Sequence, residues 1–360
     1  MDFTIRAATL EDCKDISRMI LELAEYEKLS DQVKITQEAL EQDGFSKNPF
    51  FHAIIAEVPE HLKSREGHTK VGYCLYFYAY SSFKGRAVYM EDLYVMPEFR
   101  EKGIGKALMS KVSQLGLAAG CTQLNFTVLD WNKSSLDFYL KEGCCDVTSD
   151  VGYHCMRCEG DALEHLAQSD LQTLRAFFFF AQFVIIEHRM DFTIRAATLE
   201  DCKDISRMIL ELAEHEKVSD QVKITQKDLE QDGFSKNPFF HGIIAEVPEH
   251  LKSRDGHTKV GYSLYFYTYS SWKGRAVYME DLYVMPEFRG KGIGKALMSK
   301  VSQLGLAAGC TQLNFTVLDW NKSSLDFYLK QGCWDVTSDL GYHCMRCEGD
   351  ALENLAQGDL

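Results

Sequence analysis

The 360-residue sequence contains the same segment twice, and this repeat limits every other interpretation of the chain. The run that begins at Met1 returns at Met190, and residues 1–170 and 190–359, aligned without a gap, differ at 15 of 170 positions. Solenoid repeats are about 20–50 residues long, so this period is not a solenoid unit. Each copy instead has the length of one ordinary domain. The sequence therefore predicts two domains, at residues 1–170 and 190–360, joined by an apolar connector at residues 171–189.

The connector carries one apolar run, residues 176–186, which Gln182 interrupts. Eleven residues are too few for a helix that spans a bilayer, which needs about 20. The segment also lacks the Gly, Pro and Ser of a solvated linker. Three interpretations stay open: a membrane-surface anchor, a connector docked on one domain, and a junction of two adjacent genes at Met190. The first residues show no basic stretch followed by an apolar one, so we expect a cytoplasmic protein.

Net charge narrows the choice of partners. The chain carries a formal net charge of −14, with −9 in the first copy and −6 in the second. Nucleic-acid-binding proteins carry a basic face, so we expect no nucleic-acid partner. An acidic cleft would concentrate small cations, although acidic surfaces also serve solubility alone.

The twelve cysteines divide seven and five between the copies, and each copy has one CxxC motif. These motifs, Cys155 to Cys158 and Cys344 to Cys347, raise the possibility of a metal or redox site. The surrounding residues read as a strand, in which positions three apart face opposite sides. One pair per copy also falls short of four zinc ligands. We therefore expect reduced thiols and no metal.

The pattern of apolar residues predicts an α/β fold in which helices cover a mixed sheet. A capping box at Thr9 opens the first helix, and Pro97 forces the chain to turn after the fourth strand. In the first copy we expect strands at residues 3–8, 51–58, 71–80, 87–95 and 123–129, a final hairpin within 147–158, and helices from Thr9, near 36–42, over 106–119 and over 132–141.

The strongest chemical signal lies between the fourth strand and the next helix, where the sequence reads Arg100-x-x-Gly103-x-Gly105-Lys106. Two glycines allow the backbone to approach a phosphate closely, and the helix offers free N–H groups and the positive end of its dipole. The basic side chains add charge-assisted hydrogen bonds. The dinucleotide-binding fingerprint is excluded, because the third glycine and the later acidic residue are missing. The motif predicts a phosphate-binding turn.

With Asn132 and the downstream run Asp137-Phe-Tyr139-Leu-Lys-Glu-Gly143, this motif resembles the GCN5-related N-acetyltransferase (GNAT) superfamily. Longer blocks, such as residues 27–35, 48–52, 90–97 and 128–132, are similar to the diamine (spermidine/spermine) acetyltransferases, and most similar to their thialysine-acetylating branch. The similarity covers both copies and leaves out only the connector. It implies two tandem GNAT domains, each a mixed, mostly antiparallel sheet flanked by helices, that use acetyl-CoA as co-substrate.

The resemblance also implies catalytic roles. Glu91 and Glu280 would accept a proton from the substrate amine, whose pKa near 10 keeps it charged at neutral pH. Tyr139 and Tyr328 would protonate the departing thiolate. The implied cofactor-binding residues are Leu93, Tyr94, Val95, Arg100, Glu101, Lys102, Gly103, Ile104, Gly105, Lys106, Asn132, Lys133, Ser134 and Ser135, with Leu282, Tyr283, Val284, Arg289, Gly290, Lys291, Gly292, Ile293, Gly294, Lys295, Asn321, Lys322, Ser323 and Ser324 in the second copy.

The resemblance places a small cationic amine in the acceptor site. The chain departs from the polyamine enzymes at Ser81 and at Val151 (Leu340 in the second copy), where those enzymes carry acidic residues, and its basic pair after the tyrosine is reduced to Lys141. Fewer distal carboxylates favour thialysine or a short diamine over spermine. The implied substrate-binding residues are Tyr26, Glu27, Asp92, Asn125, Phe126 and Thr127, with His215, Glu216, Asp281, Asn314, Phe315 and Thr316 in the second copy.

Alternative functions remain at this point: a spermidine/spermine acetyltransferase, a protein-lysine acetyltransferase, or an acetyl-CoA-binding protein without turnover. Members of the resembled family work as homodimers. The two copies of this chain could form such a dimer internally, with the apolar stretch 177–186 buried along it.

Overall fold

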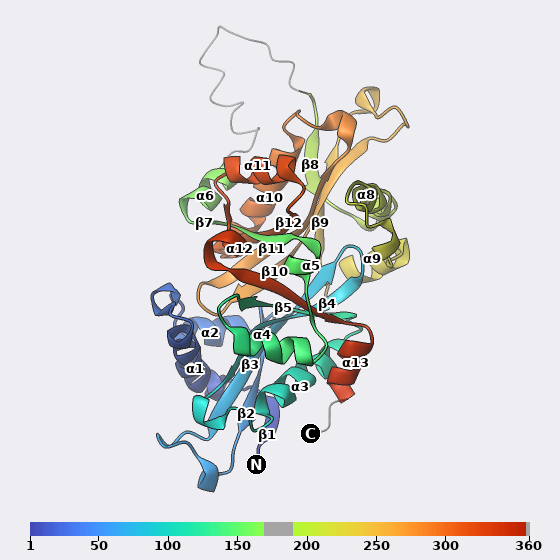
Figure 1. Cartoon of the computed structure of the whole chain (residues 1–360). Helices are drawn as coiled ribbons and strands as arrows, with labels where there is room; N and C mark the ends of the chain where they lie inside the picture. Colours follow the sequence, from blue (N-terminus) through green and yellow to red (C-terminus); the bar gives the residue numbers. More distant parts are fainter. Residues whose placement is uncertain (169–189, 358–360) are drawn as a thin grey trace.

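The computed structural model describes residues 1–168 and 190–357 (Figure 1). The predicted connector at 171–189, with its apolar stretch 177–186, lies outside the described residues. The elements of the first copy are β1 (Thr4–Ala7), α1 (Cys13–Tyr26), α2 (Gln37–Gly44), β2 (His52–Glu57), β3 (Lys70–Ser81), β4 (Gly85–Val95), α3 (Ile104–Ala118), β5 (Gln123–Leu129), α4 (Lys133–Lys141), β6 (Cys145–Asp146), α5 (Val147–Val151), β7 (Tyr153–Glu159) and α6 (Asp161–Gln168).

The second copy repeats this order. Its elements are β8 (Thr193–Ala196), α8 (Cys202–His215), α9 (Gln226–Gly233), β9 (His241–Glu246), β10 (Lys259–Ser270), β11 (Gly274–Val284), α10 (Ile293–Ala307), β12 (Gln312–Leu318), α11 (Lys322–Lys330), β13 (Trp334–Asp335), α12 (Val336–Leu340), β14 (Tyr342–Glu348) and α13 (Asp350–Gln357).

Local sequence explains the first helix. Thr9 and Asp12 form the predicted capping box, which satisfies N–H groups that the helix start leaves free. The Arg6 guanidinium donates to Asp12 at 2.7 Å and so ties β1 to the helix. Helix α1 then buries one stripe, which includes Ile16 and Ile20, against the sheet.

Two seven-stranded sheets form the core, in the orders β1-β2-β3-β4-β5-β14-β6 and β13-β7-β12-β11-β10-β9-β8. Neighbouring strands are antiparallel except β4 with β5 and β11 with β12, which are parallel. Helices flank each sheet (Figure 1), so the predicted class, a mixed and mostly antiparallel sheet covered by helices, is confirmed.

The copies exchange their last strands. Strand β7 of the first copy pairs with β12 of the second copy, and β14 of the second copy pairs with β5 of the first. In Figure 1, the red strand that leads to α13 is β14, which belongs to the sheet of the first copy, and β7 lies in the other sheet. Each sequence repeat therefore does not coincide with one sheet. The last strand of each repeat, β7 or β14, belongs to the sheet of the other repeat, and the helix that follows it, α6 or α13, goes with it.

The exchanged segments supply core side chains to the opposite copy. Met345, Leu352 and Leu355 are buried in the core of the first copy, and Met156 and Leu163 are buried in that of the second. Burial of one such side chain stabilises by about 1.5–3 kcal/mol, so each exchanged arm contributes several kcal/mol. The Gln114 amide also donates to the Ala356 carbonyl at 2.8 Å, which holds α13 against α3. This final helix was not expected from the sequence.

The expected hairpin within residues 147–158 is wrong. Asp146 accepts hydrogen bonds from the N–H groups of Thr148 and Ser149, so it caps the short helix α5 instead of extending a strand. Gly152 ends that helix with a φ of +81°, a backbone conformation that glycine adopts without strain. The chain leaves this turn toward the other copy, and β6 pairs with β14 rather than with β7.

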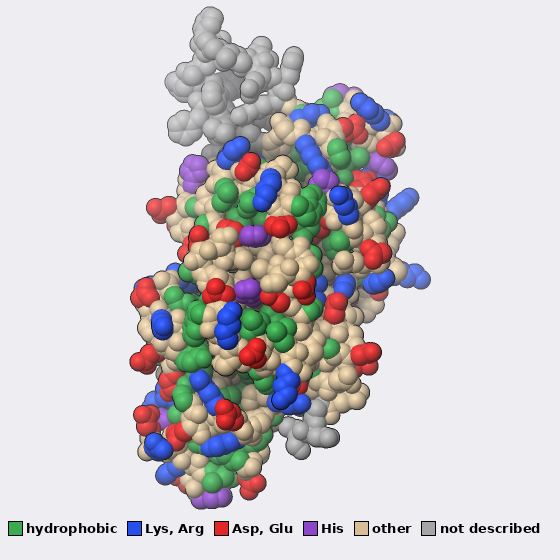
Figure 2. Space-filling view, in the orientation of Figure 1, with side chains coloured by type: hydrophobic (Ala, Val, Ile, Leu, Met, Phe, Trp, Pro, Cys, Tyr) green, Lys and Arg blue, Asp and Glu red, His purple; other side chains and the backbone are tan. Residues whose placement is uncertain are grey.

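Acidic and basic side chains are interspersed over the visible face of the molecule (Figure 2), so no extended basic stripe lies on that face among the described residues. Among the same residues, no helix is long and apolar enough to span a membrane.

Candidate active site

A gap between two parallel strands creates the site of each copy. Strand β4 pairs with β5 only through Ala87–Tyr89 and 123–125, although both strands continue further. Beyond Tyr89 the strands separate, and the ladder between β4 and β5 does not continue to Glu91–Val95; the Val95 carbonyl instead accepts a hydrogen bond from the Arg100 side chain at 3.0 Å. A register shift against β3 also makes Glu91 an extra residue, since Leu75 faces Asp92 and Tyr76 faces Met90. This bulge redirects the chain where the strands part.

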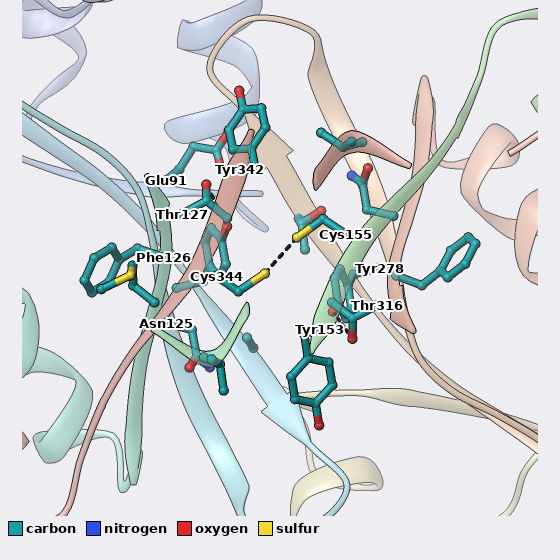
Figure 3. Close-up of a pocket in the computed structure, with 18 of the residues that line it drawn as sticks. Glu91, Asn125, Phe126, Thr127, Tyr153, Cys155, Tyr278, Thr316, Tyr342 and Cys344 are labelled. Atoms are coloured by element: carbon teal, nitrogen blue, oxygen red, sulfur yellow. Dashed lines mark hydrogen bonds between the residues drawn. The ribbon is translucent and has the colours of Figure 1, made fainter. Parts of the chain in front are cut away.

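A continuous cavity of about 1120 Å³ is lined by both copies. It includes Glu91 and Tyr139, which we call the first site, and Glu280 and Tyr328, the second site. Figure 3 shows part of its lining, with residues from both copies facing one another around the exchanged strands.

Buried carboxyl groups gather in the first site. Burial and the nearby Asp92 carboxylate raise the pKa of Glu91 and of Glu27 to about 8. Burial also raises the pKa of Asp92 to about 6, although hydrogen bonds from Tyr73 at 2.7 Å and Ser271 at 2.9 Å oppose this rise. The second site repeats the arrangement, with pKa values raised to about 8, 7 and 6 at Glu280, Glu216 and Asp281. A cation bound among these groups would relieve their desolvation and mutual repulsion.

Each site receives side chains from the other copy. The Ser271 N–H donates to the Glu91 carboxylate, and the matching Ser82 N–H donates to Glu280 at 3.2 Å. The Ser82 hydroxyl also donates to Asp281 at 2.8 Å. These serines lie in the turns that join β3 to β4 and β10 to β11, so the turn of one copy completes the acidic cluster of the other.

The exchanged strands bring further groups across. Tyr342 of β14 lies by the acidic cluster of the first site, and Tyr153 of β7 lies by that of the second. The positive charge of Arg157 opposes the rise in the pKa of Glu91. The cross-copy serines and tyrosines were missed at the sequence level, because no local pattern marks a residue that acts on another copy.

Helix α4 positions the candidate acid. Asn132 caps the helix by accepting a hydrogen bond from the Ser135 N–H, and it also accepts one from the Tyr26 hydroxyl at 3.3 Å. Tyr139, about two turns after Asn132, packs its ring 4.3 Å from that of Phe126. Burial raises the pKa of Tyr139, so its hydroxyl stays protonated at neutral pH.

The predicted phosphate-binding turn lies at the start of α3. Gly103 caps the helix with a φ of +84°, and an added Cβ there would meet nothing within 4 Å. The open Cβ position leaves room for a ligand beside the helix start, and the first N–H groups of a helix suit an anionic ligand. Arg100 lies over the Tyr26 ring at 4.7 Å, and Lys106 pairs with Glu142 at 3.1 Å. The donors present fit a pyrophosphate.

The cavity collects all four predicted catalytic residues and all twelve predicted substrate-binding residues. It also collects most of the cofactor set. The predicted residues that do not line it are Lys102, Ile104, Lys133, Gly290, Lys291, Gly292, Ile293, Lys295 and Lys322. Ile104 and Ile293 are buried in the core, and the Lys102 ammonium group donates to the Glu98 carbonyl. Among the described residues, no group of three or more His, Cys, Asp and Glu side chains is arranged to hold a metal ion.

The separated strands and the glycine-containing turn before α3 are features of an acyltransferase fold. A family model described as "Acetyltransferase (GNAT) family" matches residues 23–143 and 210–333. The two matches cover more than half of the chain, which therefore belongs to the GNAT acetyltransferase family and is an N-acetyltransferase.

The chain is similar to several known proteins. The thialysine N-epsilon-acetyltransferase of Bos taurus is 50% identical over 163 residues, which make up 45% of this chain and 96% of the relative. The spermidine/spermine N(1)-acetyltransferase-like protein 1 of Homo sapiens is 38% identical over 165 residues, 46% of this chain and 24% of that protein. A solved GCN5-related N-acetyltransferase from Sphaerobacter thermophilus is 16% identical, with a TM-score of 0.48 over 96% of this chain and 95% of that one.

Proposed function

We propose that the chain transfers an acetyl group from acetyl-CoA to the primary amine of a small cationic substrate, and that each copy supplies a complete set of catalytic residues. The observation that carries this proposal is the buried acidic cluster opposite a protonated tyrosine, beside a turn suited to an anion. One end of each site thus attracts a cation and the other end attracts a phosphate group.

Charge supports a cationic acceptor. Burial raises the pKa of Glu27, Glu91 and Asp92, and the nearby Asp92 carboxylate adds to the rise at the two glutamates. An ammonium group would pair with these carboxylates in a site of low dielectric, where the attraction is stronger than in water. A neutral or anionic acceptor would leave their desolvation unrelieved.

The proposed mechanism assigns a proton to each catalytic side chain. Glu91 accepts the proton of the substrate ammonium group, since its raised pKa of about 8 suits a base at neutral pH. Tyr139, kept protonated by burial, donates its proton to the departing thiolate. The free amine attacks the acetyl-CoA thioester directly. N–H groups of Leu93 and Val95 on the splayed strand would polarise the acetyl carbonyl.

The phosphate end of the site belongs to the turn before α3. In this proposal, Arg100 and the N–H groups that follow Gly103 hold the pyrophosphate of acetyl-CoA. Asn132 and Ser135 border the space for its pantetheine arm. The same groups recur in the second copy as Arg289, Asn321 and Ser324, so both sites would bind the donor.

We propose thialysine or a short diamine as the acceptor. The relatives named for thialysine are up to 50% identical, and Val151 and Leu340 place apolar, exposed side chains where a second carboxylate would favour a longer polycation. The spermidine/spermine alternative rests on the 38% identical human relative. Acetylation of protein lysines is the remaining alternative.

One assay tests the proposal. Acetyl-CoA consumption by the full chain is measured against thialysine, putrescine, spermidine, spermine and a histone-tail peptide, with kcat/KM as the comparison. We expect thialysine or putrescine to give the highest value, and the double variant Glu91→Gln, Glu280→Gln to lose at least about 100-fold. A higher kcat/KM for the peptide than for the small amines would refute the proposal. Undiminished acetyl-CoA consumption by the double variant would refute it as well.

A further inference from the structure

Two thiols meet where the exchanged strands cross. The sulfur atoms of Cys155 on β7 and Cys344 on β14 lie 2.8 Å apart, and the dashed line in Figure 3 joins them. Both side chains are half-buried and line the cavity between the two sites. The mutual hydrogen bond holds the sulfur atoms in contact, although 189 residues separate them in sequence.

Hydrogen bonds from the backbone hold the two cysteines in place. The Cys344 N–H donates to the Thr148 hydroxyl at 2.8 Å, and the Cys155 N–H donates to the Thr337 hydroxyl at 2.8 Å. Each strand is therefore anchored at the cysteine backbone to the short helix of the opposite copy. Either sulfur can donate the shared hydrogen bond, and donation from Cys155 lowers the pKa of Cys344. The Thr148 hydroxyl and the charge of Arg346 act in the same direction, whereas burial opposes them.

We propose that Cys155 and Cys344 form a disulfide on exposure to a peroxide, and that this disulfide bonds the two exchanged strands covalently. The Cys344 thiolate attacks one oxygen of hydrogen peroxide, the O–O bond breaks, and a sulfenic acid and hydroxide form. The Cys155 sulfur then attacks the sulfenic sulfur, the S–O bond breaks, and the thiol proton leaves with hydroxide as water. Two thiols lose two electrons, and the peroxide becomes two waters.

Other cysteine pairs join the copies but are less accessible. Cys144 shares a hydrogen bond with Cys347, and Cys333 shares one with Cys158, and all four are buried. A peroxide in the cavity reaches Cys155 and Cys344 first, because only these two of the six line the cavity.

The test uses the full chain, reduced, freed of reductant and treated with hydrogen peroxide. The expected product has two thiols fewer than the twelve of the sequence, and trypsin releases residues 142–157 linked to residues 331–346. Bridging of the buried pairs would link different peptides, because Cys158 and Cys347 follow tryptic sites. The oxidised chain should migrate faster in a denaturing gel without reductant, and its urea midpoint should rise by about 1 M.

Matched variants decide the outcome. Cys155→Ser and Cys344→Ser should each abolish the linked peptides and the faster migration, whereas Cys145→Ser, which removes an exposed thiol, should leave both unchanged. Circular dichroism of the reduced variants checks that they fold. Linked peptides that persist in either variant, a product that joins two chains, or twelve thiols after treatment would each overturn the proposal. None of these readouts depends on the acetyl-transfer activity.

Discussion

A single difference between the copies offers a controlled test of the phosphate-binding turn. Glu101 of the first copy has a φ of +61°, in the left-handed region, whereas the second copy has Gly290 there with a φ of +73°. A Cβ added at Gly290 would meet nothing within 4 Å. Exchange of the two residues therefore changes backbone strain and charge without a steric clash.

The strain term can be worked from the backbone. A residue with a Cβ loses roughly 1–2 kcal/mol in the left-handed conformation. Replacement by glycine removes this strain but also stabilises the unfolded chain by about 0.4–1 kcal/mol, because glycine has greater conformational freedom there. We therefore expect Glu101→Gly to raise the free energy of unfolding by about 0.5–1 kcal/mol, or the melting temperature by about 1–2 °C, and Gly290→Glu to lower it by a similar amount.

The charge term acts on donor binding. Glu101 lines the cavity beside the proposed pyrophosphate site, where a carboxylate repels the donor. In a chain whose second donor site is weakened by Arg289→Ala, Glu101→Gly should tighten acetyl-CoA binding a few-fold at low salt, as measured by calorimetry. The gain should vanish near 1 M salt, where the Debye length is about 3 Å, whereas the stability gain should persist. Equal affinities at low salt, or a loss of stability in Glu101→Gly, would refute the reasoning.

Three further predictions concern catalysis and assembly. The double variant Tyr139→Phe, Tyr328→Phe should lower kcat by about 100-fold or more with little change in acetyl-CoA affinity, because only the proton donor is lost; over half the wild-type rate would exclude the tyrosines as acids. In a Glu280→Gln background, kcat/KM should rise with pH through about 8, because Glu91 must be ionised to act as base. Asp92→Asn removes a charge that raises the pKa of Glu91, so it should move this rise in kcat/KM to lower pH; an unmoved pH profile would contradict the assignment of Glu91 as base. Light scattering should give a mass near the 41.1 kDa of one chain, whereas a stable mass near twice that value would mean that the copies pair between chains.

Local sequence was sufficient for most of the fold. Strand Gln123–Leu129 has the bounds that its apolar pattern predicted, and the Thr9 capping box and the turn at Pro97 lie where expected. These features depend on residues close together in the chain. The resemblance to the GNAT superfamily is confirmed by the family match in both copies.

The strand exchange could not be predicted from the sequence. Strands β7 and β14 have the same residues, YHCMRCE, and so do β5 and β12, QLNFTVL. Pairing within a copy and pairing between copies therefore give the same cross-strand contacts and the same buried faces. The turn of the chain at Gly152 directs the strand outward, and its geometry is set only in three dimensions. The contribution of Ser271 and Ser82 to the opposite sites was hidden for the same reason. The assigned roles of the site residues stay predictions.

The exchanged strands also determine when the chain can finish folding. Gln123 and Glu348 face each other in the first sheet but lie 225 residues apart, and Glu159 and Gln312 are 153 residues apart in the second. During synthesis, β7 leaves the ribosome before β12 exists. The hydrogen-bonding groups of β7 therefore have no β12 partner until 153 more residues have been made. Pairing over such distances gives a high contact order and slow closure. All strands of the second sheet have been made by residue 335, whereas the first sheet, begun by β1, is closed only by β14, the last strand to be made.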